Sequence, residues 1–64
     1  MRFNLTFSCD NAAFRDGQGK FSLDEVAWVL RRILPMVEEE QRAEGIIKDR
    51  YGNTIGAWYI AEED

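Results

Sequence analysis

Apolar and polar residues alternate strictly at the start of the chain, over residues 2–9. The apolar positions of this segment are Phe3, Leu5, Phe7 and Cys9. A period of two is typical of a β-strand that buries one of its faces. The segment is therefore predicted to be a strand. It is expected to end at Asp10 and Asn11, because such side chains hydrogen-bond to nearby backbone groups in turns.

A different period begins after residue 22, where apolar residues recur at spacings of three and four. They are Leu23, Val26, Leu30, Ile33, Leu34 and Val37. This spacing predicts an amphipathic helix, with Leu30 in the middle of its buried face and Trp28 on its polar side.

Signals for the two ends of this helix lie in the flanking sequence. Ser22 precedes Glu25 by three residues, which is the spacing of a capping box. Gly45 is typical of the residue that follows a helix, so the helix is predicted over residues 23–43. Pro35 removes one helical hydrogen bond, and it either kinks a single helix or separates two shorter ones.

The rest of the chain is predicted to form a hairpin, with strands over residues 46–50 and 54–60. Gly56 inside the second strand indicates a bulge or the close approach of another backbone. Trp58 and Tyr59 both remain candidates for the core-facing aromatic residue. The predicted fold is α+β in β-α-β-β order. One kinked helix packs across a three-stranded antiparallel sheet, in a single domain of residues 1–64.

The chain length limits the size of the core. A domain of 64 residues gains only roughly 3–5 kcal/mol of net stability from its core. Dimerisation would enlarge that core, so a monomer and a homodimer are both consistent with the sequence.

Composition narrows the expected location and chemistry. The single cysteine excludes an internal disulfide, and neither a signal peptide nor a membrane-spanning run is evident, so a cytoplasmic location is expected. Without histidine the chain has no usual base for a nucleophile and no zinc ligand set. We therefore expect a non-enzymatic protein without cofactor, in which Cys9 is a small core residue.

One segment has a partial resemblance to a metal-binding loop. Residues 14–25 place Asp16, Gly19 and Glu25 at positions 3, 6 and 12 of an EF-hand calcium loop. Phe14, however, supplies no ligand at position 1, and Gln18 is uncharged at position 5. We therefore interpret the segment as a glycine turn followed by the capping box, and predict no metal.

Two groups of exposed residues are candidates for binding a partner. The first is Trp28 with Arg31 and Arg32, residue types that are enriched at the centres of protein interfaces. The alternative is that Trp28 packs on arginine side chains. The second group is Glu38, Glu39 and Glu40, which oppose the helix dipole and therefore do not serve helix stability. They form either a solvated helix end or a negative surface for a basic partner.

The chain also resembles a group of small uncharacterised bacteriophage and prophage proteins. The resemblance rests on the motif C-D-N-A-A-F at residues 9–14 and on D-x-x-G-N-x-[IV]-G-x-W at residues 49–58. Small acidic proteins of this kind resemble inhibitors of host defence, including anti-CRISPR proteins. The resemblance implies an accessory or inhibitory role rather than a catalytic one.

Two functional hypotheses follow. In the first, an acidic, phage-encoded module binds a host protein with a basic surface, such as a nucleic-acid-binding defence complex. The net charge of −4 favours this hypothesis and makes direct binding to nucleic acid unlikely. In the second, a regulatory or structural module, monomeric or dimeric, binds nucleic acid through the polar face of its sheet.

Overall fold

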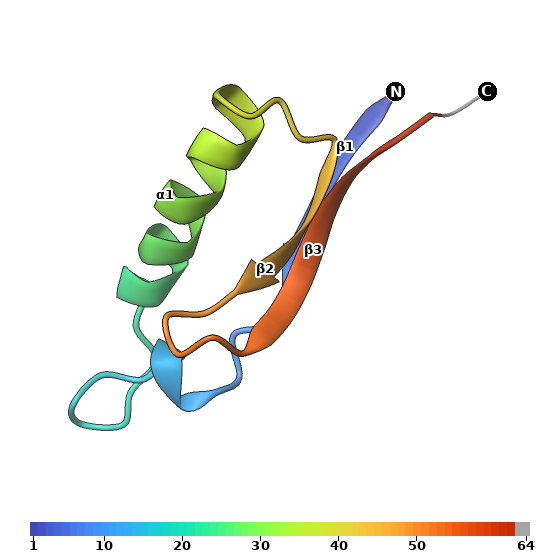
Figure 1. Cartoon of the computed structure of the whole chain (residues 1–64). Helices are drawn as coiled ribbons and strands as arrows, with labels where there is room; N and C mark the ends of the chain where they lie inside the picture. The colour runs from blue at the N-terminus through green and yellow to red at the C-terminus, as the bar shows by residue number, and fades with distance from the viewer. Residues whose placement is uncertain (63–64) are drawn as a thin grey trace.

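A computed structural model describes residues 1–62 and contains a three-stranded antiparallel sheet with one long helix (Figure 1). The elements are β1 (Arg2–Phe7), the 3₁₀ turn η1 (Ala12–Phe14), α1 (Asp24–Glu38), β2 (Glu44–Lys48) and β3 (Thr54–Ala61). The strand order is β1-β3-β2, so β3 lies between the other two strands. The predicted α+β class and the β-α-β-β order are confirmed.

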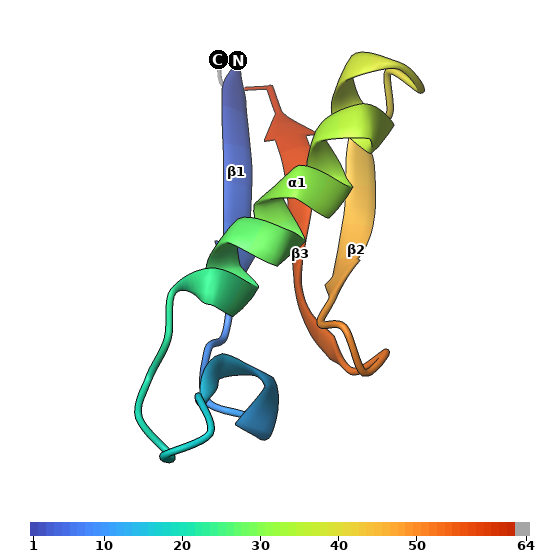
Figure 2. The same ribbon diagram turned by 90° about the vertical axis from the view of Figure 1, so that its left-hand side faces the viewer.

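The helix covers one face of the sheet and crosses it diagonally, from β1 toward the start of β2 (Figure 2). The other face of the sheet carries no element of the described chain (Figure 1). Trp58 points toward the helix and is 1% exposed, whereas Tyr59 lies on the helix-free face and is 49% exposed. The orientation of β3, which the sequence left open, is thereby determined.

Gly56 lies both at a β-bulge and at a close approach of another backbone, the two features predicted from a glycine in the last strand. Ile47 is opposite Gly56 while Lys48 is opposite Thr54, so β3 contains one extra residue at this point. A Cβ atom at Gly56 would also collide with the Thr6 carbonyl oxygen and lie 2.6 Å from Phe7 Cα. The bulge and the close approach to β1 therefore occur at the same residue.

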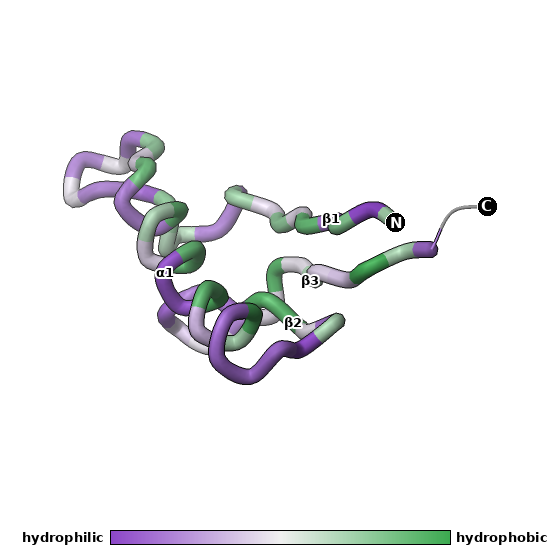
Figure 3. The backbone as a smooth tube through the Cα atoms, turned by 90° about the horizontal axis from the view of Figure 1, so that it is seen from above, coloured by the Kyte–Doolittle hydropathy of each residue, from purple (hydrophilic) through white to green (hydrophobic). Residues whose placement is uncertain are grey.

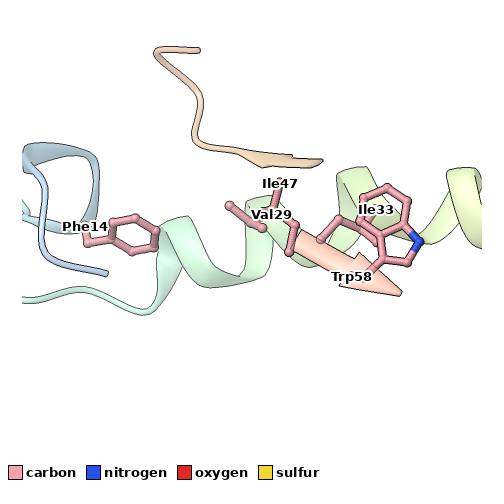
Figure 4. Packing of buried hydrophobic residues seen from close by; sticks show 5 residues of the cluster. All are labelled: Phe14, Val29, Ile33, Ile47 and Trp58. Atoms are coloured by element: carbon pink, nitrogen blue, oxygen red, sulfur yellow. The ribbon is translucent and has the colours of Figure 1, made fainter. Parts of the chain in front are cut away.

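The core is small and lies between α1 and the helix-facing side of the sheet (Figure 4). Its buried apolar residues are Phe14, Val29, Ile33, Ile47 and Trp58. Gly45 lies directly against the indole of Trp58, because a Cβ atom there would overlap the ring. The glycine expected to end the helix thus makes room for the largest core side chain.

The predicted buried face of the helix is wrong by about one residue position. Leu30 is 46% exposed, whereas its neighbour Val29 and Ile33 are buried. The cause is Glu25, which is 2% exposed and lies on the same face as Val29. The predicted capping box placed this carboxylate at the start of the helix, but an arginine from the hairpin allows it to be buried.

Both predicted ends of the helix also need correction. Ser22 Oγ accepts a hydrogen bond from Asp24 N, but the carboxylate of Glu25 turns away toward the hairpin, so no capping box forms. At the other end, α1 stops at Glu38 instead of residue 43. Gln41, and not Gly45, adopts the left-handed conformation, with φ 53°. Its side-chain Nε2 donates to the Glu38 carbonyl at 2.7 Å, which helps this residue to end the helix.

Pro35 lies within α1, so the alternative of two separate helices is wrong. The proline is in the last turn, and its carbonyl accepts hydrogen bonds from Glu39 N at 2.9 Å and Glu40 N at 3.2 Å. A proline this close to the C-terminal end removes only one bond from a ladder that is about to end.

The register of β2 predicts different effects of one substitution at two neighbouring residues. Ile47 is 1% exposed against the helix, and Ile46 is 62% exposed on the helix-free face. Ile47→Ala is expected to reduce the free energy of unfolding by about 2–5 kcal/mol, and Ile46→Ala by less than about 1 kcal/mol. Urea unfolding followed by circular dichroism measures both. Equal losses would contradict the register.

Candidate protein-binding surface

The two segments that carry the phage-protein resemblance meet at one buried carboxylate. Asp49 Oδ1 accepts hydrogen bonds from Tyr51 N and Asn53 N, both at 2.9 Å. Asp49 Oδ2 accepts from Asn53 Nδ2 at 3.1 Å and from Asn11 Nδ2 at 2.6 Å. The last bond joins the hairpin to the turn after β1, 38 residues earlier in the chain.

The hydrogen bonds also determine the protonation of this carboxylate. Burial raises the pKa of Asp49, but the bonds donated by Asn53, Asn11 and Tyr51 together outweigh that effect. The pKa of Asp49 therefore lies below its usual value, and the group is ionised at neutral pH.

Other residues of the two motifs also have roles within the fold. Phe14 is fully buried at one end of the core, and its ring lies 6.2 Å from that of Phe7. Gly52 adopts φ 83° in the hairpin turn. Together with Gly56 and Trp58, these residues build the sheet and its turns. The motifs thus describe how the chain folds and leave the contact surface to other residues.

The segment that resembles a calcium loop uses its carboxylates for other purposes. Asp16 Oδ1 accepts from Gln18 N at 2.8 Å and from Lys20 N at 3.0 Å, and these bonds lower the pKa of Asp16. Glu25 accepts from Arg50 N at 2.9 Å and Arg50 Nε at 2.5 Å. The two carboxylates therefore point to different partners. Within residues 1–62 no group of three metal-ligating side chains is present.

Trp28 is half-buried and packs between two arginines, one of which the sequence did not indicate. The Arg32 guanidinium lies 5.5 Å from the indole centroid, and the Arg50 guanidinium lies 5.4 Å from it. Arg31 is exposed and takes no part in this stack. Of the two interpretations of Trp28, stacking on arginine side chains explains the position of its indole without a binding partner.

The acidic run lies at the far end of the helix, so the six predicted contact residues form two separate surfaces. Trp28 and Glu38 are ten residues apart on α1, which corresponds to about 15 Å along the helix axis. Glu38, Glu39 and Glu40 are exposed at the end of α1, and Glu44 is exposed at the start of β2, where it is opposite Tyr59 and shares the helix-free face of the sheet. We call these four residues the acidic end.

The segment between α1 and β2 is strongly hydrophilic (Figure 3). Arg42, within it, stacks over Trp58 with its guanidinium 5.7 Å from the ring centroid. The C-terminal end of α1 adds the partial negative charge of the helix dipole. A hollow of about 410 Å³ lies beside Glu44, and Ile46 and Tyr59 are among its other lining residues.

Comparison with family models, curated proteins and solved structures finds no significant match to this chain. No helix among residues 1–62 has the length and apolar character needed to cross a membrane. The function must therefore be argued from the surface itself.

Proposed function

We propose that the chain is a non-enzymatic protein-binding module whose acidic end docks on the basic surface of a nucleic-acid-binding protein. The observation that supports this proposal is that Glu38, Glu39, Glu40 and Glu44 are all exposed at the same end of the molecule, where α1 ends and β2 begins (Figure 1). Within residues 1–62, these carboxylates are exposed and accept no hydrogen bond that would explain their position. An accessory protein or inhibitor of host defence encoded by a phage is the setting that the sequence resemblance suggests.

Closely spaced carboxylates attract the lysine and arginine side chains that otherwise bind phosphates. The C-terminal helix dipole strengthens the negative potential at this end. Such a surface accelerates association by steering, and the hollow beside Tyr59 offers an apolar contact once the partner has arrived. Binding would then occupy the surface that the partner uses for nucleic acid.

Charge reversal at the acidic end tests this proposal. The variant Glu38→Lys/Glu39→Lys/Glu40→Lys is compared with Asp10→Lys/Asp24→Lys/Glu62→Lys, which changes the net charge equally at exposed positions elsewhere. Tagged proteins capture partners from bacterial lysate at low salt, and a DNA duplex is then used as competitor. We expect wild type and the control to retain a basic protein that duplex DNA displaces, and the acidic-end variant to lose it.

The salt dependence provides a second measurement on the captured protein. Screening over about 10 Å at 0.1 M salt should weaken wild-type binding, mainly by slowing association. Equal retention by both triple variants would contradict a role for the acidic end. Retention that DNA does not affect would contradict the proposal that the partner binds nucleic acid through the same surface.

A second candidate function rests on the helix-free face of the sheet. Tyr59 is half exposed there, between the hollow already described and another of about 310 Å³ beside Asn4 and Thr6. An exposed aromatic on a sheet can stack on a nucleic-acid base. Binding of a labelled single-stranded oligonucleotide that Tyr59→Ala abolishes would favour this function over the first.

A further inference from the structure

An apolar surface remains uncovered on the helix side of the sheet. Because α1 crosses diagonally, the start of β1 and the end of β3 lie beside the helix and not beneath it (Figure 2). The exposed apolar side chains of this region are Phe3 and Ile60 on the sheet and Leu30 and Leu34 on α1. Phe3 and Ile60 are opposite each other in the β1–β3 pairing.

Leu30 and Leu34 lie on the flank of α1 that faces β1. Glu25 and Trp28 both contact Arg50, so their flank of the helix faces the β2–β3 hairpin. At 100° per residue, Leu30 and Leu34 project from the opposite flank. The helix backbone also approaches η1 and β2 most closely. The leucines therefore border the same open region as Phe3.

The edge of β1 that adjoins this region is unpaired within the described chain. β1 is an edge strand that pairs with β3 on its other side. Ser8 N donates to Ile55 O, toward β3. Backbone direction alternates along an antiparallel strand, so the N–H and C=O groups of Phe3, Leu5 and Phe7 point away from the sheet.

This edge has none of the usual features that prevent association with another strand. β1 contains no proline and no lysine, its pairing with β3 is regular, and Arg2 is its single charged residue. Natural edge strands are usually protected by charges, prolines or bulges. A regular, nearly uncharged edge beside exposed apolar side chains is a template for another strand.

We propose that β1 pairs with β1 of a second copy of this chain, antiparallel about a two-fold axis at Leu5. In this register Leu5 is opposite Leu5, and Phe3 is opposite Phe7 of the second copy. The outward backbone groups of residues 3, 5 and 7 then exchange hydrogen bonds in pairs. A six-stranded sheet results, with both helices on the same face.

The sequence of β1 is self-complementary in this arrangement. The two-fold axis places apolar residues of the two copies on the helix side and pairs Asn4 with Thr6 on the helix-free side. Phe3 of each copy comes to lie beside the N-terminal half of the other helix, where the flank of Leu30 is exposed. An isologous contact of this kind closes at two copies.

The accessible area agrees with one missing interface. The chain exposes 4844 Å², whereas a folded monomer of 7.4 kDa is expected to expose about 4200 Å². The excess, on the order of 600 Å², means that the chain leaves more surface open than a compact monomer of its mass, and each partner of a stable complex buries roughly 800 Å².

Matched charge insertions test the proposed interface. Phe3 and Tyr59 are 47% and 49% exposed and lie on opposite faces of the sheet. In sedimentation velocity between about 1 and 100 μM, we expect wild type and Tyr59→Arg to be dimers, and Phe3→Arg to raise the dimer dissociation constant at least about 100-fold. A wild-type monomer throughout this range, or equal dimerisation of both variants, would overturn the proposal.

Cross-linking tests the register without altering the core-facing residues of β1. In a Cys9→Ser background, Asn4→Cys and Thr6→Cys chains are prepared separately, reduced, mixed and then oxidised. Residues 4 and 6 of the two copies form a non-hydrogen-bonded pair with Cα atoms about 4.5 Å apart, within the range that a disulfide spans. The mixed disulfide should exceed both homodisulfides. A statistical mixture, or no cross-link in a dimer, would exclude this pairing.

Salt separates this contact from the acidic end. Backbone pairing and apolar burial carry the dimer, so its dissociation constant should change little between low and high salt, unlike capture of a basic protein. The triple reversal at Glu38, Glu39 and Glu40 should leave the dimer intact. Failure of one proposal is therefore distinguishable from failure of the other.

Discussion

Gly56→Ala is expected to unfold the protein, whereas Gly17→Ala should leave its stability unchanged or slightly raised. A Cβ atom at Gly56 would overlap the Thr6 carbonyl oxygen and come within 2.7 Å of Phe7 Cβ. The obstacle is backbone of a paired strand, so relief requires β1 and β3 to separate. A Cβ atom at Gly17 meets no atom within 4 Å. There, alanine mainly restricts the unfolded chain and stabilises by about 0.4–1 kcal/mol.

The size of the Gly56 effect follows from the small core. Forcing extra atoms into a packed site costs about 1–3 kcal/mol, and here the pairing of β1 with β3 is lost as well. A domain of this length has roughly 3–5 kcal/mol to lose. Far-ultraviolet circular dichroism and one-dimensional proton spectra of both variants measure the result. A folded Gly56→Ala variant with wild-type melting temperature would contradict the β1–β3 register.

The strands could be predicted from sequence because their signals are local. The period of two over residues 2–9 requires only neighbours, and the structure confirms a strand at Arg2–Phe7. The hairpin likewise follows from its turn residues and from Gly56. In both cases each residue's environment is determined by residues a few positions away.

The orientation of the helix could not be predicted, because it depends on a distant residue. Glu25 is buried where Arg50, 25 residues later, supplies two donors to its carboxylate. The apolar spacing did not include Glu25 in the buried face, so that face was predicted around Leu30 and not around Val29. No signal near Glu25 in the sequence indicates its partner.

The candidate surfaces also differ in whether they could be predicted from the sequence. The acidic end could be found from sequence, since Glu38, Glu39 and Glu40 are consecutive and exposed. The packing of Trp28 against Arg50 could not, because the hairpin brings them together from 22 positions apart. The bond between Asn11 and Asp49 is also long-range, joining residues 38 positions apart, and nothing in the sequence analysis predicted it.

Asp49→Asn is expected to lower the melting temperature by about 10 °C or more, although the two side chains have the same shape. Oδ1 of asparagine can still accept from Tyr51 N and Asn53 N. Its amide group would replace Oδ2, which faces the Nδ2 donors of Asn11 and Asn53. The new amide donors of residue 49 would then face the Nδ2 donors of Asn11 and Asn53, and residue 49 is only 2% exposed to solvent. Asp10→Asn, at an exposed carboxylate, is the matched control and should melt like wild type.

The pH dependence of this difference provides a more specific measurement. The pKa of Asp49 lies below its usual value near 3.8. A group with a depressed folded pKa stabilises the protein above its unfolded pKa, and this contribution is lost as the pH falls through the folded pKa. The difference in melting temperature between wild type and Asp49→Asn should therefore be constant at neutral pH and shrink below about pH 4. A difference that does not vary with pH would contradict a role for the ionised carboxylate.

Exchanging the two long-range partners tests their contact directly. In the double variant Asn11→Asp/Asp49→Asn, the new carboxylate at residue 11 can accept a hydrogen bond from the new amide at residue 49. It can also accept from Ala13 N, which in the wild type donates to Asn11 Oδ1. The clash with Asn53 Nδ2 remains, so rescue should be partial. We expect the double variant to melt above Asp49→Asn, with a favourable coupling between the two positions in a double-mutant cycle. Additive losses would show that residues 11 and 49 do not contact each other, and the turn after β1 would then not be joined to the hairpin through this bond.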